Sequence, residues 1–137
     1  MGKIGYGYGS EWHLLRFLGY HREYLSMQVL NITGGKDISW LDSHFSKKYA
    51  FLNNDRELVG LEFIKKSEVI KKWGEFWPQT GTSQNWDAVG KIIYEDHEEW
   101  LLVEAKAHLG EVQSSCGAGS PKSIAKIKLA FHKTIHS

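Results

Sequence analysis

Apolar and polar residues alternate through residues 85–108, and this pattern predicts two strands joined by a polar turn. The first strand is expected at 86–94 and the second at 100–108, with the acidic segment 95–98 between them. Side chains alternate between the two faces of a strand. The second strand therefore has one apolar face, formed by Leu101, Val103, Ala105 and Ala107. Its other face carries Trp100, Leu102, Glu104, Lys106 and His108.

The hairpin is expected to bring three charged residues together. With a turn centred on Asp96 and His97, Asp87 pairs opposite Lys106 and lies diagonal to Glu104. A loop of two or four residues gives this pairing, whereas a loop of three residues places Asp87 on the other face. Two carboxylates can hold Mg²⁺ through oxygen, and an ammonium group can orient a water molecule or offset developing charge. A cross-strand ion pair on a surface hairpin is the alternative interpretation.

Asp87, followed after sixteen residues by Glu104-Ala105-Lys106, resembles the PD-(D/E)XK motif of the restriction-endonuclease-like nucleases. Trp86 stands where the motif's name has proline. The resemblance implies an α+β domain of three layers, with a mixed central sheet flanked by helices. It also implies a metal-dependent DNA phosphodiesterase that hydrolyses its substrate directly. Asp87, Glu104 and the main-chain carbonyl of Ala105 would hold Mg²⁺ or Mn²⁺, and Lys106 would position or activate the attacking water.

A helix is predicted at 11–18, with Ser10 as its N-cap, a bend at Gly19 and a second helical stretch at 20–30. Glu11 lies on the apolar edge of this helix, because its neighbours three, four and seven positions on are leucines. Two interpretations are open. An acidic residue in the first turn is favourable to the helix dipole. Some branches of the resembled family carry a metal-binding glutamate on their first helix, and Glu11 matches that position.

Residues 38–77 are expected to form a mostly helical insertion, in which one amphipathic helix carries Trp40, Leu41, Phe45 and Tyr49. A core strand enclosed within it is expected at 49–52 or at 61–64. Paired lysines recur in this region, at 47–48, 65–66 and 71–72. They indicate either a solvated helical surface or sequence-independent contacts to phosphates.

A glycine-containing loop and a final helix follow the hairpin. Ser120 and Pro121 predict the start of this helix, with a buried stripe of Ile124, Ile127, Phe131 and Ile135. Gln113 and His108 are candidate accessory residues: a polar residue near the position of Gln113 joins the site in some branches of the family, and His108 shares the face of Lys106. The family's last core strand would come after this helix. Its absence predicts either another way of completing the sheet or a chain that is part of a longer protein with further domains.

Composition narrows the functional classes. A chain of 137 residues with 42% hydrophobic and 24% charged residues is expected to be a single globular domain. A net charge of +1 disfavours a strongly basic nucleic-acid binder but is compatible with a nuclease, whose acidic site offsets basic residues elsewhere. Cys116 is the single cysteine, which excludes a disulfide framework and a cysteine zinc site.

No signal peptide or membrane-spanning run is visible, so a cytoplasmic setting is expected. DNA is the expected partner, and a homodimer is left open. Two alternatives to a nuclease remain: a non-catalytic nucleic-acid-binding or protein-interaction module on the same fold, and a helical interaction protein in which the charges on the hairpin are structural.

Overall fold

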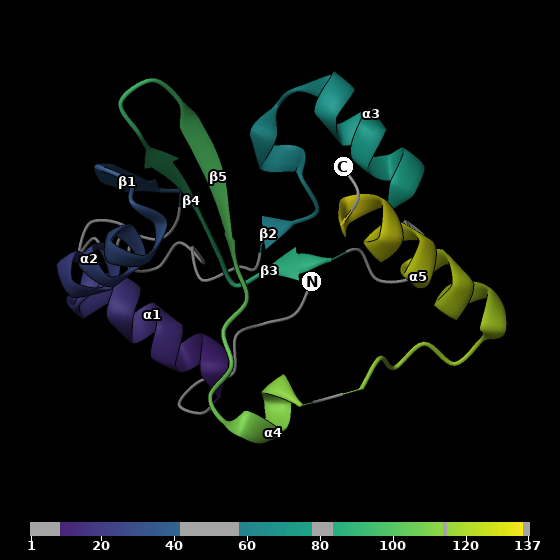
Figure 1. Ribbon diagram of the computed structural model, residues 1–137. Coiled ribbons are helices and arrows are strands. Elements are labelled where there is room, and N and C mark those ends of the chain that lie inside the picture. The colour runs from purple at the N-terminus through teal and green to yellow at the C-terminus, as the bar shows by residue number, and fades with distance from the viewer. Residues whose placement is uncertain (1–8, 42–57, 78–83, 114, 136–137) are drawn as a thin grey trace. The chain divides into compact units, whose positions relative to one another are not determined.

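The computed structural model describes residues 9–41, 58–77, 84–113 and 115–135, which combine helices with small sheets in an α+β arrangement (Figure 1). The chain forms two compact units. The first comprises Met1–Leu58 and Asn85–Val112, and the second comprises Val59–Gln84 and Gln113–Ser137. The main sheet, and the predicted hairpin within it, belong to the first unit.

The main sheet has three strands in the order β1-β4-β5 (Figure 1). Strand β1 (Asp37–Trp40) pairs with β4 (Ala88–Ile93), which pairs with β5 (Glu98–Val103), and both pairings are antiparallel. The expected hairpin is therefore confirmed, with shorter strands than predicted. The described sheet is antiparallel throughout, so the expectation of a mixed sheet is wrong for this part of the chain.

Two helices precede the sheet. Helix α1 (Ser10–Tyr20) has Gly9, with φ 100°, as its N-cap, and the predicted cap Ser10 is its first residue. Helix α2 is Arg22–Thr33, and it ends at Gly34 in the left-handed conformation. The break between the helices falls at His21, two residues beyond the predicted bend. Gly19 stays helical because a single glycine costs a helix only about 1 kcal/mol.

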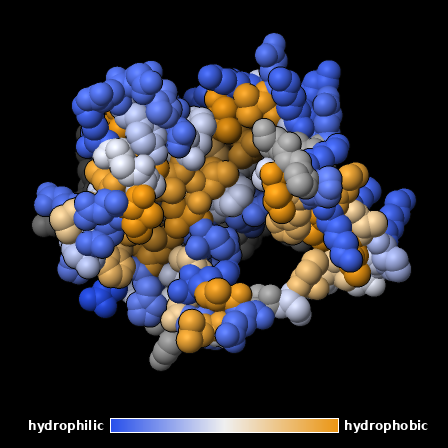
Figure 2. All heavy atoms as spheres, in the orientation of Figure 1, coloured by the Kyte–Doolittle hydropathy of each residue, from blue (hydrophilic) through white to orange (hydrophobic). Residues whose placement is uncertain are grey.

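The core of the first unit lies between α1 and one face of the sheet. Leu14 and Leu18 of α1 form a buried cluster with Ala88, against which Val103 and Ala105 pack. This contact confirms the apolar face predicted for the second strand as far as Ala105. Helix α2 adds a polar anchor, because the Trp40 indole Nε1–H donates to Ser26 Oγ at 2.9 Å. Figure 2 shows hydrophobic side chains gathered over this region, with hydrophilic ones around the turn between β4 and β5.

The second unit is built on two helices, α3 (Ser67–Phe76) and α5 (Pro121–Ile135). The rings of Trp77 and Phe131 meet edge to face, with their centroids 5.9 Å apart. The predicted buried stripe of α5 is wrong: Phe131 is 53% exposed and Ile135 is 75% exposed, and Ala130 is the buried residue of this helix. Helix α3 is shorter than α5 and covers a narrow part of its surface. The rest of the predicted apolar stripe stays exposed.

Several short elements complete the described chain: β2 (Leu58–Val59), β3 (Asn85–Trp86), the 3₁₀ helix η1 (Glu62–Ile64) and α4 (Leu109–Val112). Strands β2 and β3 make up a separate two-stranded sheet.

The region 38–77 differs from its prediction. Trp40 lies in strand β1 instead of a helix, and 62–64 form η1 instead of a core strand. Helix α3 is the helical part of this region. Phe45, Tyr49, the candidate strand at 49–52 and the lysine pair 47–48 lie outside the described residues. Within the described part of the chain, no helix is long and apolar enough to cross a membrane.

Candidate metal site at the open end of the hairpin

The register of the hairpin brings Asp87 to the end of β5. Ala88 pairs with Val103, and the pairing continues to Ile93 and Glu98. The Tyr94 N–H donates to the His97 carbonyl at 2.9 Å, so the turn is centred on Glu95 and Asp96. The regular ladder stops at Ala88, because the Asp87 N–H donates to the carbonyl of Val103, which is the partner of Ala88. The predicted pairing of Asp87 with Lys106 is therefore wrong, because the turn is centred one residue earlier than expected. This difference shifts the strand pairs by two residues and keeps every strand side chain on its predicted face.

The Asp87 carboxylate ties the two ends of the hairpin together. Its Oδ2 accepts a hydrogen bond from the Ala105 N–H at 2.6 Å, and its own N–H donates to the Val103 carbonyl at 2.9 Å. Strand β5 ends at Val103, so the Asp87 side chain takes over the pairing where the ladder stops. It thereby fixes the main chain that carries Glu104 and Lys106.

Lys106 forms an ion pair with Glu104 Oε1. The hydrogen bond to Glu104 raises the pKa of Lys106, and the negative charges of Glu104, Asp87 and Glu111 act in the same direction. The lysine is therefore an ammonium group at neutral pH. It can donate hydrogen bonds and offset negative charge, but it cannot accept a proton from water. Of the two roles predicted for Lys106, positioning the water is the one that this charge state suits.

Glu111 is a third carboxylate near Lys106 that the sequence analysis missed. Its Oε2 accepts the Ala107 N–H at 2.8 Å, and its Oε1 lies 3.2 Å from His108 Nε2. It shapes the segment that follows Lys106, and its charge adds to the field at the lysine. Its position five residues after Lys106 was the one sign of it in the sequence. Because Glu111 lies beyond the predicted strand, the alternation of strand faces gave no direction for its side chain.

The remaining predicted residues are placed differently. Glu11 is half-buried in the first turn of α1, three residues before Leu14, and Leu14 packs in the cluster with Ala88. Helix α1 therefore covers the sheet near Asp87. His108 follows the end of β5 and pairs with Glu111. Gln113 belongs to the second unit.

The oxygen atoms at this site are of the kind that binds a hard divalent cation. Asp87, Glu104 and the Ala105 carbonyl are oxygen ligands, which Mg²⁺ and Mn²⁺ prefer. In the described part of the chain, no three His, Cys, Asp or Glu side chains gather closely enough to hold a metal ion. A cation at Glu104 would have to share this carboxylate with Lys106 or displace the lysine from it.

Searches of protein-family models, of curated proteins and of solved structures returned no match for this chain.

Proposed function

We propose that this protein is a metal-dependent DNA phosphodiesterase whose site is the open end of the β4–β5 hairpin. Asp87, Glu104 and the Ala105 carbonyl would hold Mg²⁺ or Mn²⁺. The observation that carries the proposal is the hydrogen bond from the Ala105 N–H to Asp87 Oδ2. It links the two halves of the Asp87…Glu104-Ala105-Lys106 motif in space, although they are far apart in sequence.

The cation, when bound, would polarise the phosphodiester and acidify a water molecule. Asp87 would keep the ligand-bearing main chain in place through its bond to Ala105. Lys106, as an ammonium group, would orient the attacking water and offset the charge that develops on the phosphate oxygens. Water would attack phosphorus directly and the leaving oxygen would depart, with no covalent bond to the protein. Glu11 is the candidate further ligand.

The proposal extends to a restriction-endonuclease-like core. If α2, α3, α4 and the short elements between β1 and β4 are left aside, helix α1 is followed in chain order by β1, β4 and β5 and then by helix α5. The core of the resembled family begins with a helix, three strands and a helix, and this reduced order agrees with it. The antiparallel β4–β5 hairpin, with Asp87 at the entry to β4 and Glu104 at the exit of β5, supports the same assignment.

The direct test is cleavage of labelled duplex, single-stranded and branched DNA, and of RNA, with Mg²⁺ or Mn²⁺. Asp87→Asn, Glu104→Gln and Lys106→Ala are each expected to lower the rate at least a hundredfold. Lys91→Ala and Glu98→Gln are matched controls, because this ion pair lies on the same hairpin near its turn, at 2.8 Å. These controls should retain full activity. Cleavage that survives all three site substitutions would overturn the proposal.

A second candidate is a non-catalytic module, in which the same charges only stabilise the hairpin. The ion pair of Glu104 with Lys106, and the absence of a three-ligand group among the described residues, favour it. Melting temperature separates the two functions. A rise with millimolar Mg²⁺ or Mn²⁺ that Glu104→Gln abolishes supports the metal site, whereas no response to either ion supports the module.

A further inference from the structure

Charge is divided unequally between the two units. The second unit, Val59–Gln84 with Gln113–Ser137, contains eight lysines and three glutamates, which give it a net charge of +5. The first unit contains nine lysines and arginines and thirteen acidic residues, which give it −4. The near-neutral total charge of the chain is therefore the sum of a basic unit and an acidic one.

Helix α5 concentrates this positive charge. It carries four lysines and no acidic residue in fifteen positions. Three of the lysines, Lys122, Lys126 and Lys133, are spaced by four and seven residues, so they lie within about 40° of one another around the helix axis. They span about 16 Å along the axis at 1.5 Å per residue. This set of three is called the lysine row below.

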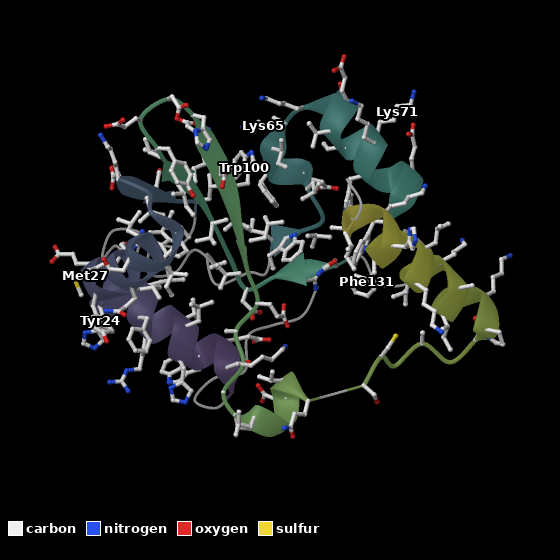
Figure 3. The ribbon with its side chains drawn as sticks, viewed as in Figure 1. Tyr24, Met27, Lys65, Lys71, Trp100 and Phe131 are labelled. Atoms are coloured by element: carbon white, nitrogen blue, oxygen red, sulfur yellow. The ribbon has the colours of Figure 1, made fainter. Side chains whose placement is uncertain are left out.

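The lysine row is available to a partner. All three side chains are exposed, and none of them forms a salt bridge with a described residue. The ring of Phe131, which packs on Trp77, lies nine residues from Lys122 and hence on the opposite side of the helix. The fully buried Ala130 lies one turn after Lys126, so the row runs beside the packed strip of α5 and is exposed next to it. In Figure 3, Lys71 also projects outward from α3.

We propose that the second unit binds the phosphate backbone of DNA through the lysine row of α5, without reading the bases. A straight row of ammonium groups complements a linear polyanion, and duplex DNA carries one negative charge per about 1.7 Å of its axis. Lysine is a point charge suited to phosphate, and the row offers no amide or guanidinium group for bidentate recognition of a base edge. The inference rests on the proposed function for the choice of DNA as the polyanion.

An anionic membrane is the competing partner. An interfacial helix inserts an apolar face into the lipid, and α5 leaves part of its apolar stripe exposed, with Ile135 at 75%. The choice of DNA over a membrane follows from the proposed function. Vesicles are therefore included in the test as the competing outcome.

The experiment measures binding of the full chain to a fluorescent 20-base-pair duplex by anisotropy, in EDTA so that no metal-dependent cleavage occurs. The triple variant Lys122→Gln/Lys126→Gln/Lys133→Gln is expected to bind at least tenfold more weakly near 0.1 M salt. Its slope of log K against log salt should be smaller by about 2.7, since each phosphate contact contributes about 0.9. Two duplexes of unrelated sequence should bind wild type equally.

The matched control is Lys36→Gln/Lys91→Gln, which removes two lysines of the first unit, each paired with a glutamate. It should bind DNA like wild type, and circular dichroism should show equal helix content in all variants. A triple variant with unchanged affinity and slope would overturn the inference. So would wild-type binding that depends on DNA sequence, or binding to phosphatidylserine vesicles without binding to DNA.

Asp87→Asn separates this inference from the proposed function. The variant tests cleavage alone, and the wild type and the triple variant test binding. Row-dependent binding by a protein that cleaves nothing would leave the inference standing and remove the nuclease proposal. Metal-dependent cleavage by a protein whose DNA affinity does not change in the triple variant would support the nuclease proposal and overturn this inference.

Discussion

Asp87 Oδ2 accepts the Ala105 N–H at 2.6 Å, and this bond joins the entry to β4 with the exit from β5. The same carboxylate is thus a structural group and a candidate metal ligand. Its removal is expected to change both stability and chemistry, so the two effects must be separated by the choice of substitution.

Asp87→Ala removes the acceptor and leaves the Ala105 N–H, which is half-buried, without its partner. We expect a loss of about 1–3 kcal/mol in the free energy of unfolding, the usual cost of an unsatisfied buried donor. Asp87→Asn retains a side-chain carbonyl oxygen and should lose less. Urea unfolding followed by circular dichroism measures both. Equal stability of the alanine and asparagine variants would show that the hydrogen bond does not hold the hairpin.

The packing of α1 on the sheet predicts a large effect at Leu18, which is 1% exposed in the cluster with Ala88. Leu18→Ala should destabilise the protein by about 2–5 kcal/mol, because it removes buried methyl groups and leaves a cavity. Ile32→Ala on α2 is the control. Ile32 is 85% exposed, so its truncation should change stability by less than about 0.5 kcal/mol. Similar losses at the two positions in urea unfolding would contradict the described packing.

Gly35 lies close against the side chains of Ile92 in the sheet and Leu30 in α2. A Cβ atom at this position would lie 2.3 Å from Ile92 Cγ2 and 3.0 Å from Leu30 Cδ2. Gly35→Ala should therefore destabilise the protein by about 1–3 kcal/mol through overpacking. A Cβ atom at Gly117 meets no atom within 4 Å, so Gly117→Ala is a matched control. If both variants melt at a lower temperature by a similar amount, the cause would be the lost conformational freedom of glycine and not a steric conflict at Gly35.

The hairpin could be predicted because alternation over many residues fixes which side chains share a face. Ala105 and Val103 do pack toward the core, as that pattern requires. The pairing register could not be predicted, because the acidic segment 95–98 contains no glycine or asparagine that marks the turn. Two adjacent polar residues in it serve equally well as a turn, and choosing the wrong two shifted every predicted pair by two residues.

The pattern of apolar and polar residues could not predict the short elements or what packs against each helix. Strand β1 has four residues, too few for alternation to distinguish it from a helix, and Trp40 was assigned to the wrong element. In α5 the apolar spacing predicted the helix but not its burial, since burial depends on what packs against it. Glu111 was missed for a related reason: it lies in the short helix α4, in a stretch predicted as a loop, so its contacts to Ala107 and His108 could not be foreseen from spacing.

The turn of the hairpin carries a histidine between two carboxylates. The His97 ring stacks on Tyr94 with centroids 4.5 Å apart. Its Nδ1 lies 2.7 Å from Asp96 Oδ1, and its Nε2 lies 3.4 Å from Glu99 Oε1. The hydrogen bond with Asp96 raises the pKa of His97, with a smaller contribution from Glu99, and it lowers the pKa of Asp96.

A histidine whose pKa is raised on folding stabilises the protein most when it is protonated. This contribution is complete below the unfolded pKa of about 6.5, and it disappears as pH rises through the higher pKa of the folded state. Titration of the His97 ring by NMR should give a pKa above that of an unstructured histidine. Asp96→Asn should lower it, whereas Glu95→Gln should leave it unchanged, because the Glu95 carboxylate pairs with Lys36. A His97 pKa that is the same in wild type and Asp96→Asn would rule out the Asp96 hydrogen bond as the cause.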